Sequence, residues 1–246
     1  MSTWVSAKVL WRKIWAPGLV TLQLDAQLSF KPGQFTNVAI EREGVRMRRS
    51  YSLASAPGAP AELYINEVVE GGLSPQLIAL DAGSSILIDS KPSGFFTLDE
   101  LSGGEELWLL ATGSGLGPYI AMLRSGQAQR QFGKVVLVHA VREQRHLGYR
   151  EELEQLQASS GGSVKIVCVT SRQAPPTGGL QGRIPALIEN GQLEAAAGCG
   201  LDLNRSRVLL CGNPQMIADV KSTLAGRGFA MHRRRAPGQI LTENYW

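Results

Sequence analysis

A change of hydrophobic rhythm near residue 106 constrains the fold of this chain most. After it come four continuously apolar runs, as expected for parallel strands that helices cover on both faces: "ELWLLAT", "KVVLVHAV", "VKIVCVTS" and "RVLLCG". Segments with helical character lie between and after them: "PYIAMLRS", "LGYREELEQLQAS", "RIPALIEN" and "PQMIADVKSTLAG". This alternation predicts an α/β doubly wound parallel sheet.

The preceding part of the chain has a different pattern. Residues 1 to about 97 hold short, β-branched or alternating runs that Gly, Pro and Asp separate, which favours a sandwich or a closed antiparallel barrel. One short helix is expected at 73–80, with Ser74 as its N-cap and Pro75 at the first helical position. We therefore predict two domains: an N-terminal antiparallel β-barrel over 1–97, a linker over 98–106 and the α/β domain over 107–246.

Composition excludes several classes of site. The 246 residues include three cysteines without C-x-x-C spacing, which argues against a disulfide framework, a zinc site and a four-thiolate iron–sulfur cluster. The three histidines lack ligand spacing, so no metal is expected. No stretch is long and apolar enough to cross a membrane, and the start lacks the order of a signal peptide. The expected location is cytoplasmic.

Basic residues are clustered although the formal net charge is only +4. The clusters are "RMRR" at 46–49 and "HRRR" at 232–235. No helix-turn-helix, RNA-binding or zinc-finger pattern accompanies them, so nucleic acid is not an expected partner. Each cluster is either a solvated basic face or a surface that attracts phosphates or a small acidic protein.

The loop "ATGSGLGP" at 111–118 leaves the first parallel strand and enters a helix. Its glycines let a backbone approach a ligand, and a helix N-terminus offers free N–H groups to a phosphate. The spacing differs from both common phosphate-loop motifs, so plain turn chemistry is an equal alternative. Its position at the carboxyl end of a strand favours a ligand site.

Three arginines follow the other predicted strands at that same edge: Arg142, Arg172 and Arg183. A single arginine there is usually a solvated surface residue. Three together, with Ser171 beside one of them, suit a phosphate monoester, because the guanidinium group offers planar paired donors. Such an extra phosphate distinguishes NADPH from NADH.

Two further motifs each allow a structural and a functional interpretation. Cys211 in "CGNP" is either a small buried apolar residue or a strand-end group that faces a nicotinamide. In "RRSYSLAS", Arg49 and Tyr51 share one face of a strand. Tyr51 is either half-buried packing or a flat ring for stacking beside a pyrophosphate clamp, to which Ser74 would add a second set of phosphate donors.

Together these motifs resemble the ferredoxin–NADP⁺ reductase family, and most closely its bacterial ferredoxin/flavodoxin members. They span nearly the whole chain in the family's order: "RSYS" at 49–52, "GGLSP" at 71–75, "ATGSGLGPY" at 111–119, "HAVR" at 139–142, "SR" at 171–172, "GRIPALIE" at 182–189, "LCGNPQM" at 210–216 and the ending "ENYW".

The resemblance implies FAD bound by the barrel and NADP(H) bound by the α/β domain. The implied FAD residues are Arg49, Ser50, Tyr51, Ser52, Tyr64, Ile65, Asn66, Gly72, Leu73, Ser74, Ser114, Tyr245 and Trp246. The implied NADP residues are Thr112, Gly113, Gly115, Arg142, Ser171, Arg172, Arg183, Gly212 and Asn213. Asn66 and Glu67 depart from the apolar or hydroxyl residues of the family's strand.

The resemblance also implies a reaction centre. Ser52, Cys211 and Glu243 would form a polar cluster around the point of hydride transfer. Tyr245 would stack on the isoalloxazine face opposite Tyr51, in the place of the nicotinamide, and Trp246 would pack against a folded-back FAD adenine.

The expected function is that of an FAD oxidoreductase that takes a hydride from NADPH and passes single electrons to ferredoxin or flavodoxin. Arg233 to Arg235 would dock this acidic carrier, and the protein is expected to be a monomer. Alternatives remain: an NADPH-dependent flavin or quinone reductase, a cluster-free reductase component of an oxygenase, or a non-catalytic flavin or nucleotide sensor.

Overall fold

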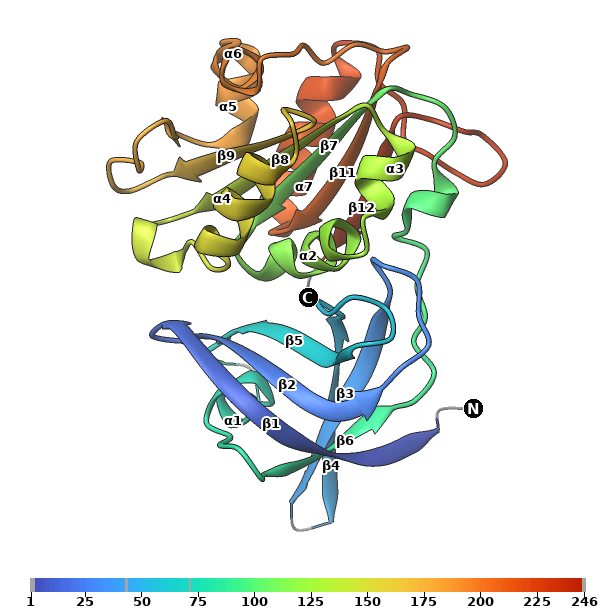
Figure 1. Cartoon of the computed structure of the whole chain (residues 1–246), viewed down its shortest axis with the longest axis vertical. Coiled ribbons are helices and arrows are strands. Elements are labelled where there is room, and N and C mark those ends of the chain that lie inside the picture. The colour runs from blue at the N-terminus through green and yellow to red at the C-terminus, as the bar shows by residue number, and fades with distance from the viewer. Residues whose placement is uncertain (1–2, 43, 71, 245–246) are drawn as a thin grey trace. The chain divides into compact units, whose positions relative to one another are not determined.

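The computed structural model describes residues 3–42, 44–70 and 72–244 of the chain (Figure 1). They form two compact units. The first unit, called the barrel unit below, comprises residues up to Leu98 together with Gly117–Ser125. The second unit, called the sheet unit, comprises Asp99–Leu116 and the residues from Gly126 onward.

The barrel unit is built on a six-stranded sheet with the order β4-β3-β6-β1-β2-β5, in which all paired strands are antiparallel. Its strands are β1 (Trp4–Ala16), β2 (Leu19–Gln27), β3 (Phe35–Arg42), β4 (Val45–Ser52), β5 (Pro60–Asn66) and β6 (Ser85–Asp89). The two edges meet after β4, where Leu53 bridges to Leu63 and the Ala54 N–H donates to the Glu62 carbonyl at 2.9 Å. Alternate side chains fill the interior, which confirms the predicted antiparallel barrel.

The short helix α1 (Ser74–Ile78) lies within the predicted range, but its N-cap is Leu73. The prediction that Ser74 caps this helix is therefore wrong. The Ser74 hydroxyl instead accepts a hydrogen bond from the Val68 N–H at 2.9 Å, so it fixes the segment that leads into the helix. The sequence predicts Pro75 at the first helical position; the helix begins at Ser74, so Pro75 is its second residue, still within the first turn.

The sheet unit holds a six-stranded sheet with the order β10-β9-β8-β7-β11-β12, and all its strand pairs are parallel. The strands are β7 (Glu106–Thr112), β8 (Lys134–Val141), β9 (Val164–Thr170), β10 (Leu180–Gln181), β11 (Ser206–Gly212) and β12 (Ile240–Asn244). Its helices are α3 (Gln127–Gln131), α4 (Arg150–Ser159), α5 (Ile184–Glu189), α6 (Gln192–Ala197) and α7 (Pro214–Ala225). Its 3₁₀ turns are η2 (Gly113–Leu116) and η3 (Gln144–His146), and a third, η1 (Leu98–Glu100), begins on the last residue of the barrel unit's first segment.

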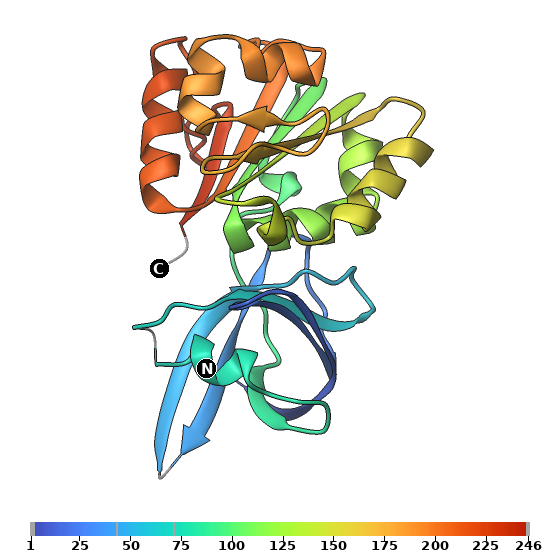
Figure 2. The same cartoon turned by 90° about the vertical axis from the view of Figure 1, so that its left-hand side faces the viewer.

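Helices cover both faces of this parallel sheet. Figure 2 shows α7, in red-orange, on one side of the sheet and α4, in yellow, on the other. Trp108, Leu110 and Val138 belong to a core shared with residues of α5, α6 and α7. This arrangement confirms the predicted doubly wound α/β fold.

Two strands lie outside the four apolar runs of the prediction. β10 is a two-residue strand beside β9, and β12 pairs with β11 at the end of the described chain. The last four residues therefore divide: Glu243 and Asn244 belong to a strand, whereas Tyr245 and Trp246 lie outside the described residues.

Helix α2 (Gly117–Arg124) groups with the barrel unit, although its sequence lies within the range predicted for the α/β domain. The Arg124 guanidinium donates to the Glu62 carboxylate at 2.6 Å and to the Ala54 carbonyl at 3.1 Å. Only 7% of Glu62 is exposed, and its other carboxylate oxygen accepts from the Gln23 amide at 3.1 Å. This ion pair ties the end of α2 to the rim of the barrel.

Within the described ranges, no helix is long and apolar enough to cross a membrane. The cytoplasmic location stays a prediction.

Candidate functional site

Three arginines are carried by the carboxyl edge of the parallel sheet. Beyond the ends of β8 and β9 the pairing continues: the Ser171 N–H donates to the Val141 carbonyl at 3.0 Å, and the Arg172 N–H donates to the Arg142 carbonyl at 2.9 Å. Arg183 precedes α5 directly, and it follows Gly182, whose N–H donates to the Thr170 carbonyl at 2.9 Å. The prediction that these arginines share one edge is confirmed.

All three guanidinium groups are free to bind an anion. Arg142, Arg172 and Arg183 are exposed. Within the described part of the chain, no carboxylate pairs with any of them, in contrast to Arg145 and Arg150, which pair with Glu143 and Glu154. Unpaired arginines on backbone that the sheet holds in place can bind a phosphate with paired donors.

The glycine-rich turn after β7 contacts the turn after β11. A Cβ added to Gly115 would collide with the Cys211 carbonyl, and one added to Gly212 (φ +128°) would collide with the Thr112 hydroxyl. The Asn213 N–H donates to that same hydroxyl at 2.8 Å. Gly115 and Gly212 therefore allow two turns of the backbone to pack closely against each other. This agrees with the alternative in which the glycines are needed for turn geometry.

Gly113 differs from its neighbours in this turn. Its φ of +54° lies in the left-handed region, and a Cβ there would meet nothing within 4 Å. The backbone of Gly113 is thus open on the side where a side chain would stand. This opening lies at the carboxyl end of a central strand, where ligands of doubly wound sheets bind.

His139 is a part of the site that the sequence reasoning missed. It lies on β8, it is 1% exposed, and its ring hydrogen-bonds to the backbone of Gly113. Burial lowers the pKa of His139 to about 4, and the bond to Gly113 partly opposes this. Its Nε2 has no hydrogen-bond partner among the described residues. The signal in the sequence was a lone histidine inside the apolar run "VLVHAV".

The predicted reaction-centre residues lie in both units. Cys211 is fully buried at the end of β11, and Glu243, on β12, is its partner in the strand register. Ser52, which is 5% exposed, ends β4 of the barrel unit. Asn213 caps α7, because its side-chain oxygen accepts from the N–H groups of Gln215 and Met216 at 2.9 and 3.2 Å. The catalytic and nucleotide-binding roles of these residues stay predictions.

On strand β4, Arg49 and Tyr51 share one face, as predicted. Burial raises the pKa of Tyr51 to about 12, and the nearby charge of Arg49 partly opposes the rise. The Tyr51 ring packs against the barrel core but is only half-buried. Arg49 is exposed, and its guanidinium donates to the Arg48 carbonyl at 2.9 Å. Among the described residues, no carboxylate neutralises Arg49.

The structure brings the segment 72–74 to this strand. The Gln76 amide donates to the Gly72 carbonyl at 2.8 Å and also contacts the Met47 sulfur at 3.6 Å. A Cβ on Gly72 would lie 3.3 Å from that sulfur, so a small residue fits best there. Met47 shares its face of β4 with Arg49. On β5, Tyr64 and Ile65 are buried and Asn66 is exposed.

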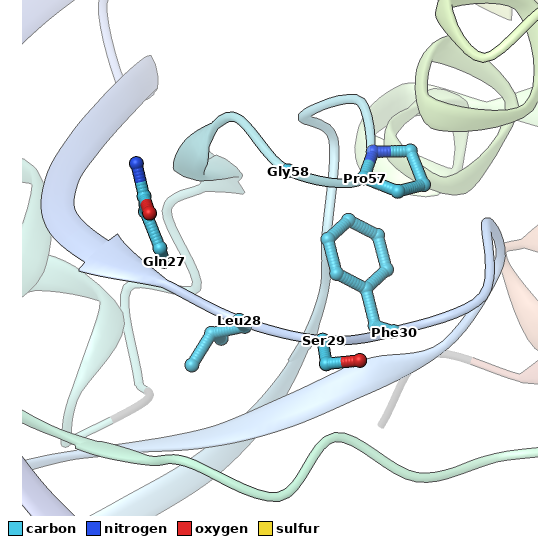
Figure 3. Close-up of a pocket in the computed structure, with 6 residues that line it drawn as sticks. All are labelled: Gln27, Leu28, Ser29, Phe30, Pro57 and Gly58. Atoms are coloured by element: carbon cyan, nitrogen blue, oxygen red, sulfur yellow. The ribbon is translucent and has the colours of Figure 1, made fainter.

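A separate hollow lies in the barrel unit, with a volume of about 320 Å³ (Figure 3). It is lined by Gln27, Leu28, Ser29, Phe30, Pro57 and Gly58. None of these residues belongs to the motifs above, so the hollow is not the predicted site. No group of three or more potential metal ligands occurs in the described residues.

Comparisons with known proteins give a consistent result. Residues 109–222 match the family model described as the oxidoreductase NAD-binding domain. The curated flavodoxin/ferredoxin–NADP reductases of Shigella flexneri and Escherichia coli (strain K12) are each 41% identical over 249 aligned residues, which cover all of both chains. A solved ferredoxin NADP⁺ reductase from Neisseria gonorrhoeae, with bound FAD and NADP, superimposes with a TM-score of 0.93 at 34% identity and covers 99% of each chain.

Proposed function

Because this chain belongs to the family of flavodoxin/ferredoxin–NADP reductases, we propose that it is an FAD-dependent oxidoreductase that transfers electrons between NADPH and ferredoxin or flavodoxin. The observation that carries this conclusion is the identity of 41% over the full length of both chains. When bound, the two cofactors supply hydride transfer from nicotinamide to flavin and release of the electrons in single steps.

The sheet unit fits NADP(H) by its donor chemistry. The three unpaired arginines, Arg142, Arg172 and Arg183, would hold the 2′-phosphate, together with the hydroxyl of Ser171. The open backbone at Gly113 offers an approach for the nucleotide between Thr112 and Ser114. Gly212 and Asn213 complete this edge, because they are held against Thr112. The role of these residues is to bind and orient the nucleotide.

The barrel unit fits FAD by a similar argument. Arg49 is an exposed cation without an acidic partner in the described ranges, and it lies beside the half-buried ring of Tyr51. Gly72, Leu73 and Ser74 are linked to the same strand through Gln76, whose amide donates to the Gly72 carbonyl at 2.8 Å and contacts the Met47 sulfur at 3.6 Å. Arg49 and the segment 72–74 would hold the pyrophosphate, and Tyr51 would stack on the flavin ring. Ser50, Ser52, Tyr64, Ile65, Asn66 and Ser114 remain proposed FAD contacts.

The proposed reaction centre consists of Ser52, Cys211 and Glu243, with Tyr245 covering the flavin. Cys211 and Glu243 stand on adjacent strands in register, which supports a shared polar site at the end of β11. Their proposed task is to position the reacting rings and to stabilise charge, without covalent catalysis. Tyr245 and Trp246 lie outside the described residues, so their stacking roles rest on the family alone.

For the electron carrier we propose a docking surface at the turn around Arg233 to Arg235. Arg233 and Ala236 exchange backbone hydrogen bonds of 3.0 and 2.9 Å, which makes the intervening residues the tip of a turn. Arg234 pairs with Glu100 at 3.2 Å. Arg233 and Arg235 are exposed and have no carboxylate partner in the part of the chain that the structure describes. These two charges would therefore attract an acidic carrier.

The experiment that tests the function mixes the purified holoprotein with NADPH and then offers single-electron carriers. We expect NADPH to bleach the flavin absorbance, and we expect added ferredoxin or flavodoxin to restore it. A flavin that NADPH does not bleach would point to a sensor. Bleaching without electron transfer to either carrier would point to another acceptor, such as a quinone or a free flavin.

A further inference from the structure

We propose that Gln144 and Gln173 are positioning residues that hold the Arg142 and Arg172 backbones together, and so set the preference for a 2′-phosphorylated nucleotide. The inference rests on the proposed NADP(H) function and adds two residues that the sequence motifs do not include. Both glutamines follow the arginines closely: Gln173 comes directly after Arg172, and Gln144 comes two residues after Arg142.

The two glutamines link the loops by side-chain hydrogen bonds. The Gln144 N–H donates to the Gln173 side-chain oxygen at 3.1 Å. In return, the Gln144 side-chain amide donates to the Ala174 carbonyl at 2.8 Å. The Thr170 hydroxyl donates to the Gln173 carbonyl at 2.5 Å and thereby fixes the chain on the far side of Arg172. We call these three contacts the glutamine bracket.

The bracket adds hydrogen bonds between the two loops just beyond the point where the backbone pairing of β8 and β9 ends. β8 and β9 stop at Val141 and Thr170, and among the described residues two backbone hydrogen bonds, donated by Ser171 and Arg172, join the segments that follow. After these bonds the two segments run over the surface, where loops are mobile unless further contacts hold them. The bracket supplies such contacts at the next residues along, so the backbones of Arg142 and Arg172 are held on both sides.

Holding the backbone matters more here than at most surface arginines. No carboxylate orients the guanidinium groups of Arg142, Arg172 and Arg183 in the described structure. Whether they can reach one phosphate together therefore depends on where the backbone places each Cα. A phosphate that binds two or three of them pays less ordering entropy if their loops are already joined. Loss of the bracket should therefore weaken the binding of a nucleotide that carries the adenosine 2′-phosphate, and it should leave the binding of a nucleotide that lacks this phosphate nearly unchanged.

The variant Gln173→Ala removes the acceptor for the Gln144 N–H, and Gln144→Ala removes the donor to Ala174. We expect each to weaken binding of 2′,5′-ADP to the FAD-loaded protein by roughly 3- to 10-fold, the range of one lost neutral hydrogen bond. The KM for NADPH should rise by a similar factor with kcat nearly unchanged, while the KM for NADH should change by less than about 2-fold. Gln155→Ala, at an exposed position of α4, is the matched control and should leave both values unchanged.

A second comparison separates positioning from general loop stability. In an Arg142→Ala, Arg172→Ala background, Gln173→Ala should cause little further loss of 2′,5′-ADP binding, because the groups that it positions are gone. Unchanged 2′,5′-ADP binding in both single variants would overturn the inference, as would equal losses with NADPH and NADH. If the wild-type protein itself failed to bind 2′,5′-ADP, the proposed function would fail and the bracket with it. Wild-type binding with unaffected variants would overturn the bracket alone.

Discussion

His139 should make the protein sensitive to mild acid. The folded protein keeps this buried imidazole neutral, because burial lowers its pKa from 6.5 to about 4. An unfolded chain takes up the proton near pH 6.5. The unfolded state therefore binds more protons between these two values, and the stability that His139 contributes is complete above pH 6.5 and is lost as the pH falls toward 4.

The size of this effect follows from the two pKa values. They differ by about 2.5, and each pKa unit corresponds to about 1.4 kcal/mol. Protonation of His139 should therefore cost at most about 3 to 4 kcal/mol of unfolding free energy, and about 2 kcal/mol of that should be lost between pH 7 and pH 5. This is a substantial part of the stability of a typical domain.

The variant His139→Asn tests the prediction. Asparagine keeps an amide donor close to the position of Nδ1, so the contact to Gly113 can persist, but it does not titrate. We expect urea unfolding of the holoprotein to show a loss of stability from pH 7 to pH 5 that is about 2 kcal/mol larger in the wild type than in the variant. His146→Asn, at a half-buried position of η3, controls for the removal of an imidazole. If the wild type and His139→Asn lost the same stability over this pH range, the reasoning would be refuted.

Three further predictions concern the two proposed binding surfaces and the glycine turns. Arg172→Ala with Arg183→Ala should cost roughly 1.5–3 kcal/mol of NADPH binding per charge-assisted contact and leave NADH nearly unaffected, as steady-state kinetics would measure; equal losses with both nucleotides would contradict the phosphate site. Arg233→Ala with Arg235→Ala should slow reduction of the carrier at low ionic strength and make the rate of that reduction less dependent on salt. Reduction of a small artificial acceptor is the control. An unchanged salt dependence of carrier reduction would exclude this docking surface. Gly212→Ala should destabilise the protein by roughly 1–3 kcal/mol, because the added Cβ would collide with Thr112 at a φ of +128°. Gly191→Ala, also at positive φ but in open space, should destabilise it less. Thermal unfolding would rank the two variants, and equal losses of stability would argue against the collision.

The architecture could be predicted because each unit repeats one pattern many times. Four apolar runs were enough to indicate the parallel sheet, and the rule that parallel strands end at one edge placed Arg142, Arg172 and Arg183 together. β12 was not predicted, because "ILTEN" is short and its last three residues are polar. An edge strand can be short and polar, because it pairs on one side only. The sequence showed only that Ser74 could be a cap, since the same hydroxyl can bond to either of two nearby backbone segments.

The remaining features depend on contacts between residues far apart in the chain. His139 is one histidine in an apolar run, and only the path of the glycine-rich turn over β8 explains it. Two of the three contacts of the glutamine bracket join residues 29 and 30 positions apart, through side chains that are common on any surface. No local periodicity records such a contact. Sequence reasoning therefore located the arginines but not the residues that hold them.

Helix α2 has a consequence for the order in which the chain is made. The barrel unit needs Gly117–Ser125, so it cannot be completed on the ribosome when its last strand has emerged; it must wait until the first parallel strand of the other unit has also been synthesised. A gene cut between the two sheets would release a barrel that retains Glu62 but lacks Arg124. That carboxylate would keep its hydrogen bond from the Gln23 amide but would lose its cation, and the barrel would lose this tie to α2. No single break separates this protein into complete halves: a break before residue 117 takes α2 from the barrel unit, and a break after residue 125 takes β7 from the middle of the parallel sheet.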